Sequence, residues 1–159
     1  MKKLLLLLFL IPLISCTEDW TGEKEVTFLQ ERNGIKYEVN SDVGFTGKYV
    51  EYFVNGQKRI EEHLKLGKRN GLNTEWYENG QKKFERNWVD GKFDGLTTGW
   101  HENGQKKIES NWKNNKYDGL ATGWHENGQK KYESNWKNNK WDGLRTEWHE
   151  NGQKKSEKD

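Results

Sequence analysis

The most constraining feature of the sequence is the triplet Asn-Gly-Gln, which recurs at a constant step of 24 residues. It starts at Asn55, Asn79, Asn103, Asn127 and Asn151. The unit at 95–118 returns almost unchanged at 119–142. Such a period predicts stacked copies of one small unit rather than a globule around a single centre. We therefore expect any function to reside on a surface built from copies.

Each unit has one alternating run before Asn-Gly and one after it, which predicts a β-hairpin per repeat. A three-residue loop at 102–104, with its glycine left-handed in a G1 bulge, pairs Trp100 with Lys106 and Thr98 with Ile108. A two-residue Asn-Gly turn would put Trp100 and Ile108 on opposite faces, so the longer loop is preferred because it gathers the apolar side chains. The turn residues are then Asn55, Gly56, Asn79, Gly80, Asn103, Gly104, Asn127, Gly128, Asn151 and Gly152. We expect the Asn-Gly-Gln triplet to orient the tryptophan rings and to bind no ligand itself.

The same alternation of side chains can be applied to the link between one hairpin and the next. It pairs Trp112 with Leu120 and Ile108 with Trp124, and it leaves 113–119 as a longer loop. Every repeat then extends one sheet with an apolar face and a solvated face of Lys, Glu, Asn, His and Gly. The predicted fold is all-β, an elongated single-layer antiparallel sheet of repeated hairpins. Its apolar face is the candidate binding face, with Trp76, Trp88, Trp100, Trp112, Trp124, Trp136 and Trp148.

The ends of the array differ from its middle, as terminal repeats must because they face water. The last strand is Lys-rich, with Ser156 at the position of an apolar residue, and such a strand blunts a sheet edge. We assign 47–159 to the repeat domain, whose first copy is weak. Residues 25–46 are assigned to a degenerate capping hairpin with its loop at 32–34, and 16–24 to a tether.

The N-terminus has the layout of a secretory signal: two lysines, an apolar run at 4–13 and the tetrapeptide Leu-Ile-Ser-Cys ending at Cys16. The run is too short to cross a bilayer, which needs roughly 20 residues. The tetrapeptide resembles the lipobox of bacterial lipoproteins. That resemblance implies removal of 1–15, lipidation of Cys16 and a location in the bacterial cell envelope. The acidic sequence at 17–19 favours the outer membrane or the cell surface. Cys16 is also the only cysteine, so no disulfide is expected in the mature chain.

Charge and composition narrow the function classes. Removal of the leader takes Lys2 and Lys3, so 27 basic residues become 25 against 25 acidic ones. A nearly neutral chain lacks the basic surface of a nucleic-acid-binding protein, and no nucleic-acid partner is expected. The hydrophobic content is only 31%, yet nine residues are Trp. The apolar surface is therefore concentrated in a few large rings.

The pattern Gly-x4-Trp/Tyr-x2-Asn-Gly-Gln-Lys-Lys-x4-Trp covers about 47–153. It resembles the bacterial variant of the MORN repeat, a β-hairpin module. Proteins with this repeat are often labelled antitoxin components of toxin–antitoxin pairs. The resemblance implies the fold and a binding surface. An anchor outside the cytoplasm departs from the antitoxin role.

The sequence Trp-His-Glu at 100–102, 124–126 and 148–150 raises the question of metal or acid–base chemistry. Equivalent residues of neighbouring hairpins lie two strands apart, about 10 Å. Zinc bonds to histidine of about 2.0–2.1 Å cannot bridge that gap, so solvated histidines are expected. Cys16 is committed to the lipid, and no serine lies in a Gly-x-Ser-x-Gly elbow. We expect no enzyme, no cofactor and no metal.

The tryptophan column either packs within the sheet or docks another molecule. The favoured hypothesis is a membrane-anchored lipoprotein whose repeat sheet is a protein-binding or scaffold surface for another protein or for a second copy. The alternatives are binding of a surface glycan or the cell wall through the aromatic ladder, and an antitoxin-type repeat protein. The solvent accessibility of the rings distinguishes a binding face from a scaffold that covers itself.

Overall fold

A computed structural model describes residues 17–18 and 22–159, so the leader and Cys16 lie outside the described residues. The described residues form strands and no helix. The N-terminal strands are β1 (Thr17–Glu18), β2 (Lys24–Val26), β3 (Gln30–Arg32) and β4 (Ile35–Tyr37). The repeat strands are β5 (Gly47–Tyr52), β6 (Lys58–Lys65), β7 (Lys68–Arg69), β8 (Gly71–Trp76), β9 (Lys82–Val89), β10 (Lys92–Trp100), β11 (Lys106–Lys113), β12 (Lys116–Trp124), β13 (Lys130–Lys137), β14 (Lys140–Trp148) and β15 (Lys154–Lys158).

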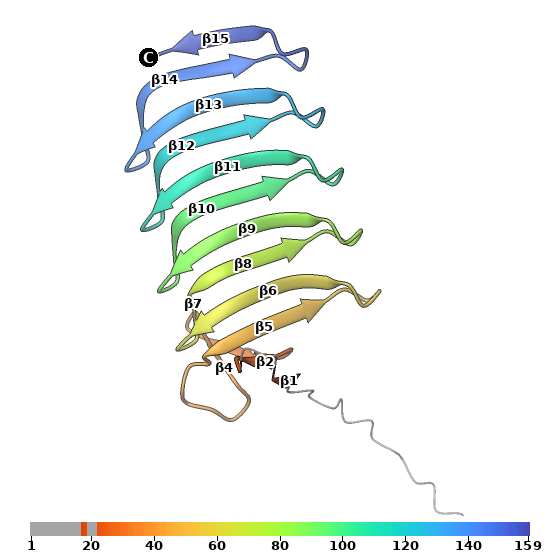
Figure 1. Cartoon of the computed structure of the whole chain (residues 1–159). Coiled ribbons are helices and arrows are strands. Elements are labelled where there is room, and N and C mark those ends of the chain that lie inside the picture. The colour runs from red at the N-terminus through yellow and green to blue at the C-terminus, as the bar shows by residue number, and fades with distance from the viewer. Residues whose placement is uncertain (1–16, 19–21) are drawn as a thin grey trace, which may run out of the picture.

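The strands form one long sheet in which each hairpin stacks on the previous one, as Figure 1 shows from β5 to β15. Neighbouring strands are antiparallel throughout this run, while β2 joins β5 in parallel at the N-terminal end. The strands β3 and β4 form a separate hairpin. This confirms the predicted all-β fold of successive hairpins. Among the described residues, no helix is long and apolar enough to cross a membrane.

The Asn-Gly turn has the predicted geometry. The backbone N–H of Gly104 donates to the carbonyl of His101 at 2.9 Å, and Gly104 is left-handed with φ +82°. Trp100 lies opposite Lys106, as a three-residue loop with a G1 bulge requires. The predicted turn is therefore confirmed, although the reason for preferring it, a single apolar face, does not hold.

Beyond the turn, the predicted register is wrong by one residue. Gly99, not Thr98, lies opposite Ile108, because Lys107 is an extra residue in β11. A bulge of one residue moves every side chain beyond it to the other face. The predicted single face of tryptophans is therefore split in two. Trp88, Trp112 and Trp136 lie on one face, and Trp76, Trp100, Trp124 and Trp148 lie on the other.

The predicted long loop at 113–119 is also wrong. Asn114 and Asn115 have φ of 49° and 64° and form a two-residue turn of type I′, which needs two left-handed residues. Trp112 lies opposite Tyr117 rather than Leu120, and Ile108 lies opposite Gly123 rather than Trp124. The register shift is absorbed by a bulge inside β12, where Gly119 has φ +113°.

The N-terminal end is closed by a small cap. Val26, Phe45 and Leu64 form its buried apolar cluster. The carboxylate of Glu62, 2% exposed, accepts hydrogen bonds from Lys36 on β4 and, at 2.7 Å, from Arg69 Nε on β7. The strand β2 joins this cap to the sheet, with Glu25 opposite Lys48 and Val26 opposite Tyr49.

Candidate binding surface

The most continuous feature of the surface is a stack of six aromatic rings that runs along the array, beside the type I′ turns. We call it the aromatic ladder, and its members in order are Trp88, Phe93, Trp112, Tyr117, Trp136 and Trp141. Successive ring centroids are 3.9, 5.2, 3.8, 5.4 and 5.9 Å apart. Each aromatic contact of this kind contributes about 0.5–1.5 kcal/mol beyond area burial. The ladder therefore joins successive hairpins to one another.

The hairpin register explains the ladder. Trp112 and Tyr117 are cross-strand partners on either side of the turn at 114–115, so their rings share a face. The ring of Tyr117 then reaches Trp136 in the next hairpin. Phe93, Tyr117 and Trp141 were not among the predicted rings, because the expected long loop covered the residues on both sides of the two-residue turn. The signals that could have found them are Asp90-Gly91 and the asparagine pairs at 114–115 and 138–139.

The ladder rings turn their faces toward one another. The first four contacts have interplanar angles of 32°, 38°, 33° and 34°, and only the last, between Trp136 and Trp141, is edge-on at 70°. The outward surface of the ladder is therefore made largely of ring edges, which carry the positive end of the aromatic quadrupole. A sugar that stacks on an aromatic face finds most of these faces occupied.

Small residues beneath the ladder hold the rings in place. Trp112 Nε1 donates to Ser110 Oγ at 2.9 Å, and Ser110 is only 1% exposed. Trp136 and Ser134 repeat this bond at 2.9 Å. Trp88 Nε1 is buried without a partner because Arg86 occupies the position of the serine. The indole planes of the two later tryptophans are thus set by hydrogen bonds as well as by packing.

The exposed lysines beside the turns belong to the face away from the ladder. One follows each two-residue turn, and these are Lys68, Lys92, Lys116 and Lys140. Lys116 lies opposite Lys113, whereas its neighbour Tyr117 lies opposite Trp112, and adjacent residues of a strand point to opposite faces. Arg69 lies 5.0 Å from the Trp88 ring centroid at one end of the ladder, and Arg145 lies 5.3 Å from that of Trp141 at the other. Both arginines are paired with carboxylates, Arg69 with Glu62 and Arg145 with Glu147.

Nearby acidic groups neutralise other lysines. Lys113 Nζ donates to Asp94 at 2.9 Å, and Lys137 Nζ donates to Asp118 at 3.0 Å. The hydrogen bond from Lys113 lowers the pKa of Asp94.

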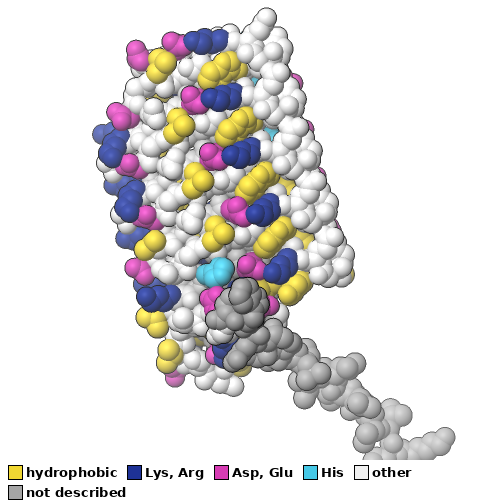
Figure 2. Space-filling view, in the orientation of Figure 1, with side chains coloured by type: hydrophobic (Ala, Val, Ile, Leu, Met, Phe, Trp, Pro, Cys, Tyr) yellow, Lys and Arg dark blue, Asp and Glu magenta, His cyan; other side chains and the backbone are white. Residues whose placement is uncertain are grey.

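The opposite face is occupied by ion pairs. On this face each tryptophan ring has a lysine of the preceding repeat over it, as Lys82 lies 5.8 Å from the Trp100 centroid and Lys106 lies 5.6 Å from that of Trp124. The same lysines pair with Glu85 and Glu109. Leucines form a second column, 40–44% exposed, at Leu72, Leu96, Leu120 and Leu144. Figure 2 shows hydrophobic side chains in columns along the stack, with Lys/Arg and Asp/Glu between them.

His101 and His125 are not solvated as predicted, whereas His149 is exposed. The side chain of His101 is 12% exposed, and its Nε2 lies 3.1 Å from the carbonyl of Trp124 in the next hairpin. His125 makes the same contact with Trp148 at 3.0 Å. These side chains are links between repeats. No group of three or more His, Cys, Asp or Glu among the described residues could hold a metal ion.

The Asn-Gly-Gln triplet also joins repeats, a role that the sequence pattern did not predict. Asn103 Nδ2 donates to the carbonyl of Glu126 at 2.8 Å, while its Oδ1 accepts from the N–H of Gln105 at 3.0 Å. The Gln105 side chain fills the space beside Gly128, where a Cβ would lie 2.4 Å from its Oε1. The triplet therefore shapes its own turn and fastens the next one.

Replacing Asn103 with alanine is expected to cost about 0.5–1.5 kcal/mol of unfolding free energy, because one hydrogen bond between repeats and one within the turn are lost. Asn151 supplies the matched control. Its Nδ2 bonds only Gln153 of its own turn, at 3.3 Å. Urea unfolding followed by circular dichroism measures both variants. Equal losses at the two positions would contradict a stabilising contact between repeats.

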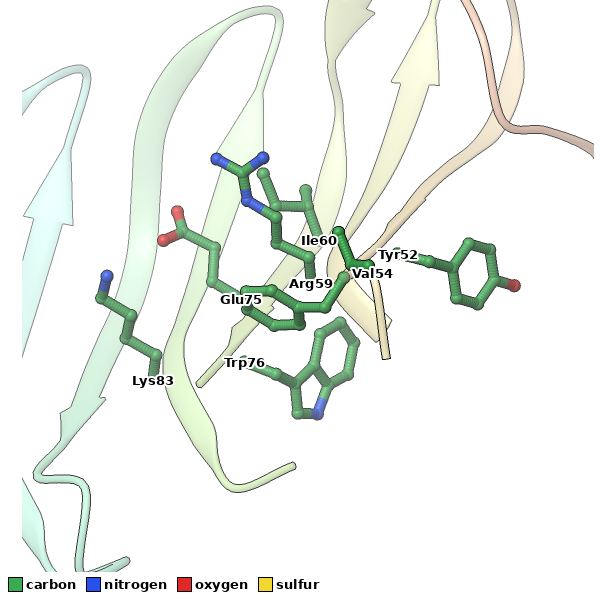
Figure 3. Close-up of a pocket in the computed structure, with 8 residues that line it drawn as sticks. Tyr52, Val54, Arg59, Ile60, Glu75, Trp76 and Lys83 are labelled. Carbon is green, nitrogen blue, oxygen red and sulfur yellow. The ribbon is translucent and has the colours of Figure 1, made fainter. Parts of the chain in front are cut away.

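Shallow hollows lie between neighbouring Asn-Gly turns. The first, of about 460 Å³, is lined by Tyr52, Phe53, Val54, Arg59, Ile60, Glu75, Trp76 and Lys83. Figure 3 shows its side chains spread apart, with the Tyr52 ring pointing away from Glu75 and Lys83. A similar hollow recurs around His125 in the later repeats. These spaces follow the repeat and bring together no nucleophile and base.

The repeating geometry agrees with the comparison to known families. The model of the MORN repeat variant matches residues 69–90, 93–114, 117–138 and 141–159. The chain is a MORN-repeat protein. Among curated proteins, none matches it. Each matched MORN unit begins just after a type I′ turn, and the two central units each contribute two rings to the ladder. MORN-repeat proteins are typically binding or scaffold proteins.

Proposed function

We propose that this MORN-repeat protein is a non-catalytic envelope lipoprotein whose aromatic ladder binds a segment of another protein. The observation that supports the proposal is the ladder itself, a strip of six aromatic rings that runs along the stack. The described residues form a single-layer sheet with a small cap at one end, and so provide no second layer over this strip. An uncovered aromatic strip of this kind is typical of an interaction site.

A protein partner fits this surface better than a sugar does. Glycan stacking requires free ring faces, whereas the faces of the ladder rings are in contact with one another. The tryptophans on the opposite face have lysines over them. Small ligands also prefer enclosed cavities, and the hollows of this sheet are open. Peptides, by contrast, bind along exposed strips and grooves.

Site-specific photocrosslinking in the producing cells tests the proposal. A crosslinker replaces Trp141, the exposed last ring of the ladder, or Lys107, which lies near the other end of a hairpin. We expect a discrete adduct from position 141 that protease digestion reduces in mass, and none from position 107. A protease-resistant adduct would favour a glycan. Adducts from both positions, or only monomer, would contradict the proposal.

The lipid anchor is a separate part of the proposal, carried by the sequence at Cys16. Cys16→Ser is expected to abolish incorporation of a labelled fatty acid and to release the protein from the membrane fraction. An outer, lipid-anchored location separates this protein from a cytosolic toxin. Recovery of wild-type protein from the cytoplasm, without fatty acid, would instead favour the antitoxin-type alternative.

A further inference from the structure

We propose that Asn151 is a site of spontaneous deamidation, at which the side-chain amide becomes a carboxylate, while the asparagines of the four earlier Asn-Gly-Gln turns are protected. Asparagine followed by glycine is prone to this reaction, because glycine has no side chain to hinder attack by its backbone nitrogen. The five turns provide a matched series within one chain. Their asparagines differ in one contact, which is the hydrogen bond from the side-chain nitrogen.

The reaction needs only the turn and water. The backbone nitrogen of Gly152 attacks Cγ of Asn151, the Cγ–Nδ2 bond breaks, and the proton of the Gly152 N–H leaves with the ammonia. The new bond from nitrogen to Cγ closes a cyclic imide. Water then adds to one of the two imide carbonyls and opens the ring. Attack on the Cγ carbonyl gives aspartate, and attack on the main-chain carbonyl gives isoaspartate, so either product adds one negative charge.

The backbone of the turn does not distinguish the five sites. Each asparagine is exposed to solvent, and each accepts a hydrogen bond at 3.0 Å from the N–H of the glutamine two residues later. Each turn glycine is left-handed, with φ between 80° and 84°, and its N–H donates to the carbonyl three residues before it. Neither access to water nor the shape of the turn therefore sets an order of reaction.

The local sequence does not distinguish the later sites either. The hexapeptide Glu-Asn-Gly-Gln-Lys-Lys surrounds four of the five asparagines, at 78–83, 102–107, 126–131 and 150–155. Asn33 and Asn70 also precede glycines, but they lie in other backbone settings. Asn33 has φ 53° in the turn between β3 and β4, and Asn70 lies between β7 and β8. These two are therefore not members of the matched series.

The bond from the side-chain nitrogen distinguishes the last turn. In the four earlier turns, Nδ2 donates to a backbone carbonyl of the next turn at 2.7–3.1 Å. Among the described residues, Asn151 Nδ2 bonds only the side-chain oxygen of Gln153, at 3.3 Å. The asparagine amide has to rotate before the glycine nitrogen can reach Cγ. In the earlier turns this rotation breaks a bond to the backbone of a packed hairpin, whereas at Asn151 it breaks a longer bond to a flexible side chain. The barrier is therefore lower at Asn151.

The product is also better tolerated at Asn151. Deamidation replaces a donating –NH2 group by a carboxylate oxygen, which only accepts hydrogen bonds. At Asn103 this oxygen would face the carbonyl of Glu126 across the 2.8 Å that a hydrogen bond now spans, and two acceptors repel each other. At Asn151 the Gln153 amide can turn its own –NH2 group toward the carboxylate. The N–H of Gln153 continues to donate to the other oxygen.

Peptide mass spectrometry of the full chain tests the proposal. The folded protein is incubated in mildly alkaline buffer and then digested with trypsin. The peptides that end at Lys58, Lys106, Lys130 and Lys154 each contain one Asn-Gly pair and differ in sequence. We expect Asn151 to lose its amide about two- to tenfold faster than Asn103 or Asn127, because one hydrogen bond fewer has to break. In urea that unfolds the chain, these three rates should become equal.

Three outcomes would overturn the assignment. Equal rates in the folded chain would show that the bond to the next hairpin gives no protection. Rates that stay unequal in urea would trace the difference to sequence. A fastest reaction at Asn55 would point to packing around the glycine, since no described atom lies within 4 Å of a Cβ added at Gly56, while Gln129 lies beside Gly152.

Aspartate variants test the tolerance of the product. Asn103→Asp is expected to lower the midpoint of thermal unfolding by about 2–6 °C, because the bond to Glu126 is replaced by a repulsion. Asn151→Asp is the matched control and is expected to leave the midpoint nearly unchanged. An equal loss at both positions would contradict a special tolerance at the last turn.

Discussion

Trp112→Ala is expected to lower the unfolding free energy by about 2–4 kcal/mol, measured by urea denaturation. The variant loses ring contacts to Phe93 and Tyr117, whose centroids lie 5.2 and 3.8 Å away. It also uncovers the hydroxyl of Ser110, which is buried beneath the indole and accepts its N–H. A gap in the middle of the ladder interrupts the contact between neighbouring hairpins, and nearest-neighbour contacts carry the stability of a repeat array.

Trp141→Ala is the matched control for the ladder. Trp141 is 56% exposed and makes one edge-on ring contact, with Trp136 at 5.9 Å. Its removal is expected to cost about 1 kcal/mol or less, because little area is uncovered and only one aromatic contact is lost. If both variants lose the same free energy, ring stacking is not what stabilises the ladder.

Gly67→Ala is expected to detach the N-terminal cap and to cost about 3 kcal/mol or more. A Cβ at this position would lie 2.4 Å from Ile35 Cγ2 and 2.6 Å from the carbonyl oxygen of Lys36, and the backbone is left-handed with φ +75°. The N–H of Gly67 donates to the carbonyl of Phe45, and its own carbonyl accepts from the N–H of Lys36. Hydrogen exchange at the Lys36 amide reports the detachment directly.

Gly143→Ala separates backbone strain from collision. Gly143 is also left-handed, with φ +85°, but nothing lies within 4 Å of an added Cβ. Alanine at this position is expected to lower the unfolding free energy by only about 1–2 kcal/mol, which is the cost of its left-handed conformation. The Lys36 amide should exchange as in the parent protein. Fast exchange in this variant, or slow exchange in Gly67→Ala, would show that the close contacts at Gly67 do not hold the cap.

The predicted Asn-Gly turns and their G1 bulges are confirmed, although the single apolar face that favoured them is not. The left-handed glycine at Gly104 and the pairing of Trp100 with Lys106 depend on residues that are close together in the sequence. The constant spacing of the triplet predicted the stacked hairpins. The turn at 114–115 could also have been predicted, because two consecutive asparagines readily adopt a type I′ turn. The predicted pairing of Trp112 with Leu120 placed these asparagines inside a longer loop instead.

The sequence by itself determined the period, the hairpin unit and the turn that begins each copy, because these depend on neighbours within a few residues. Only the tertiary structure decided which tryptophans share a face. That choice depends on one extra residue, Lys107, whose accommodation is set by the pairing of whole strands. The bond from Asn103 to Glu126 and the contact from Tyr117 to Trp136 likewise join different hairpins. Such contacts exist only after the hairpins stack, so the ladder is a product of stacking.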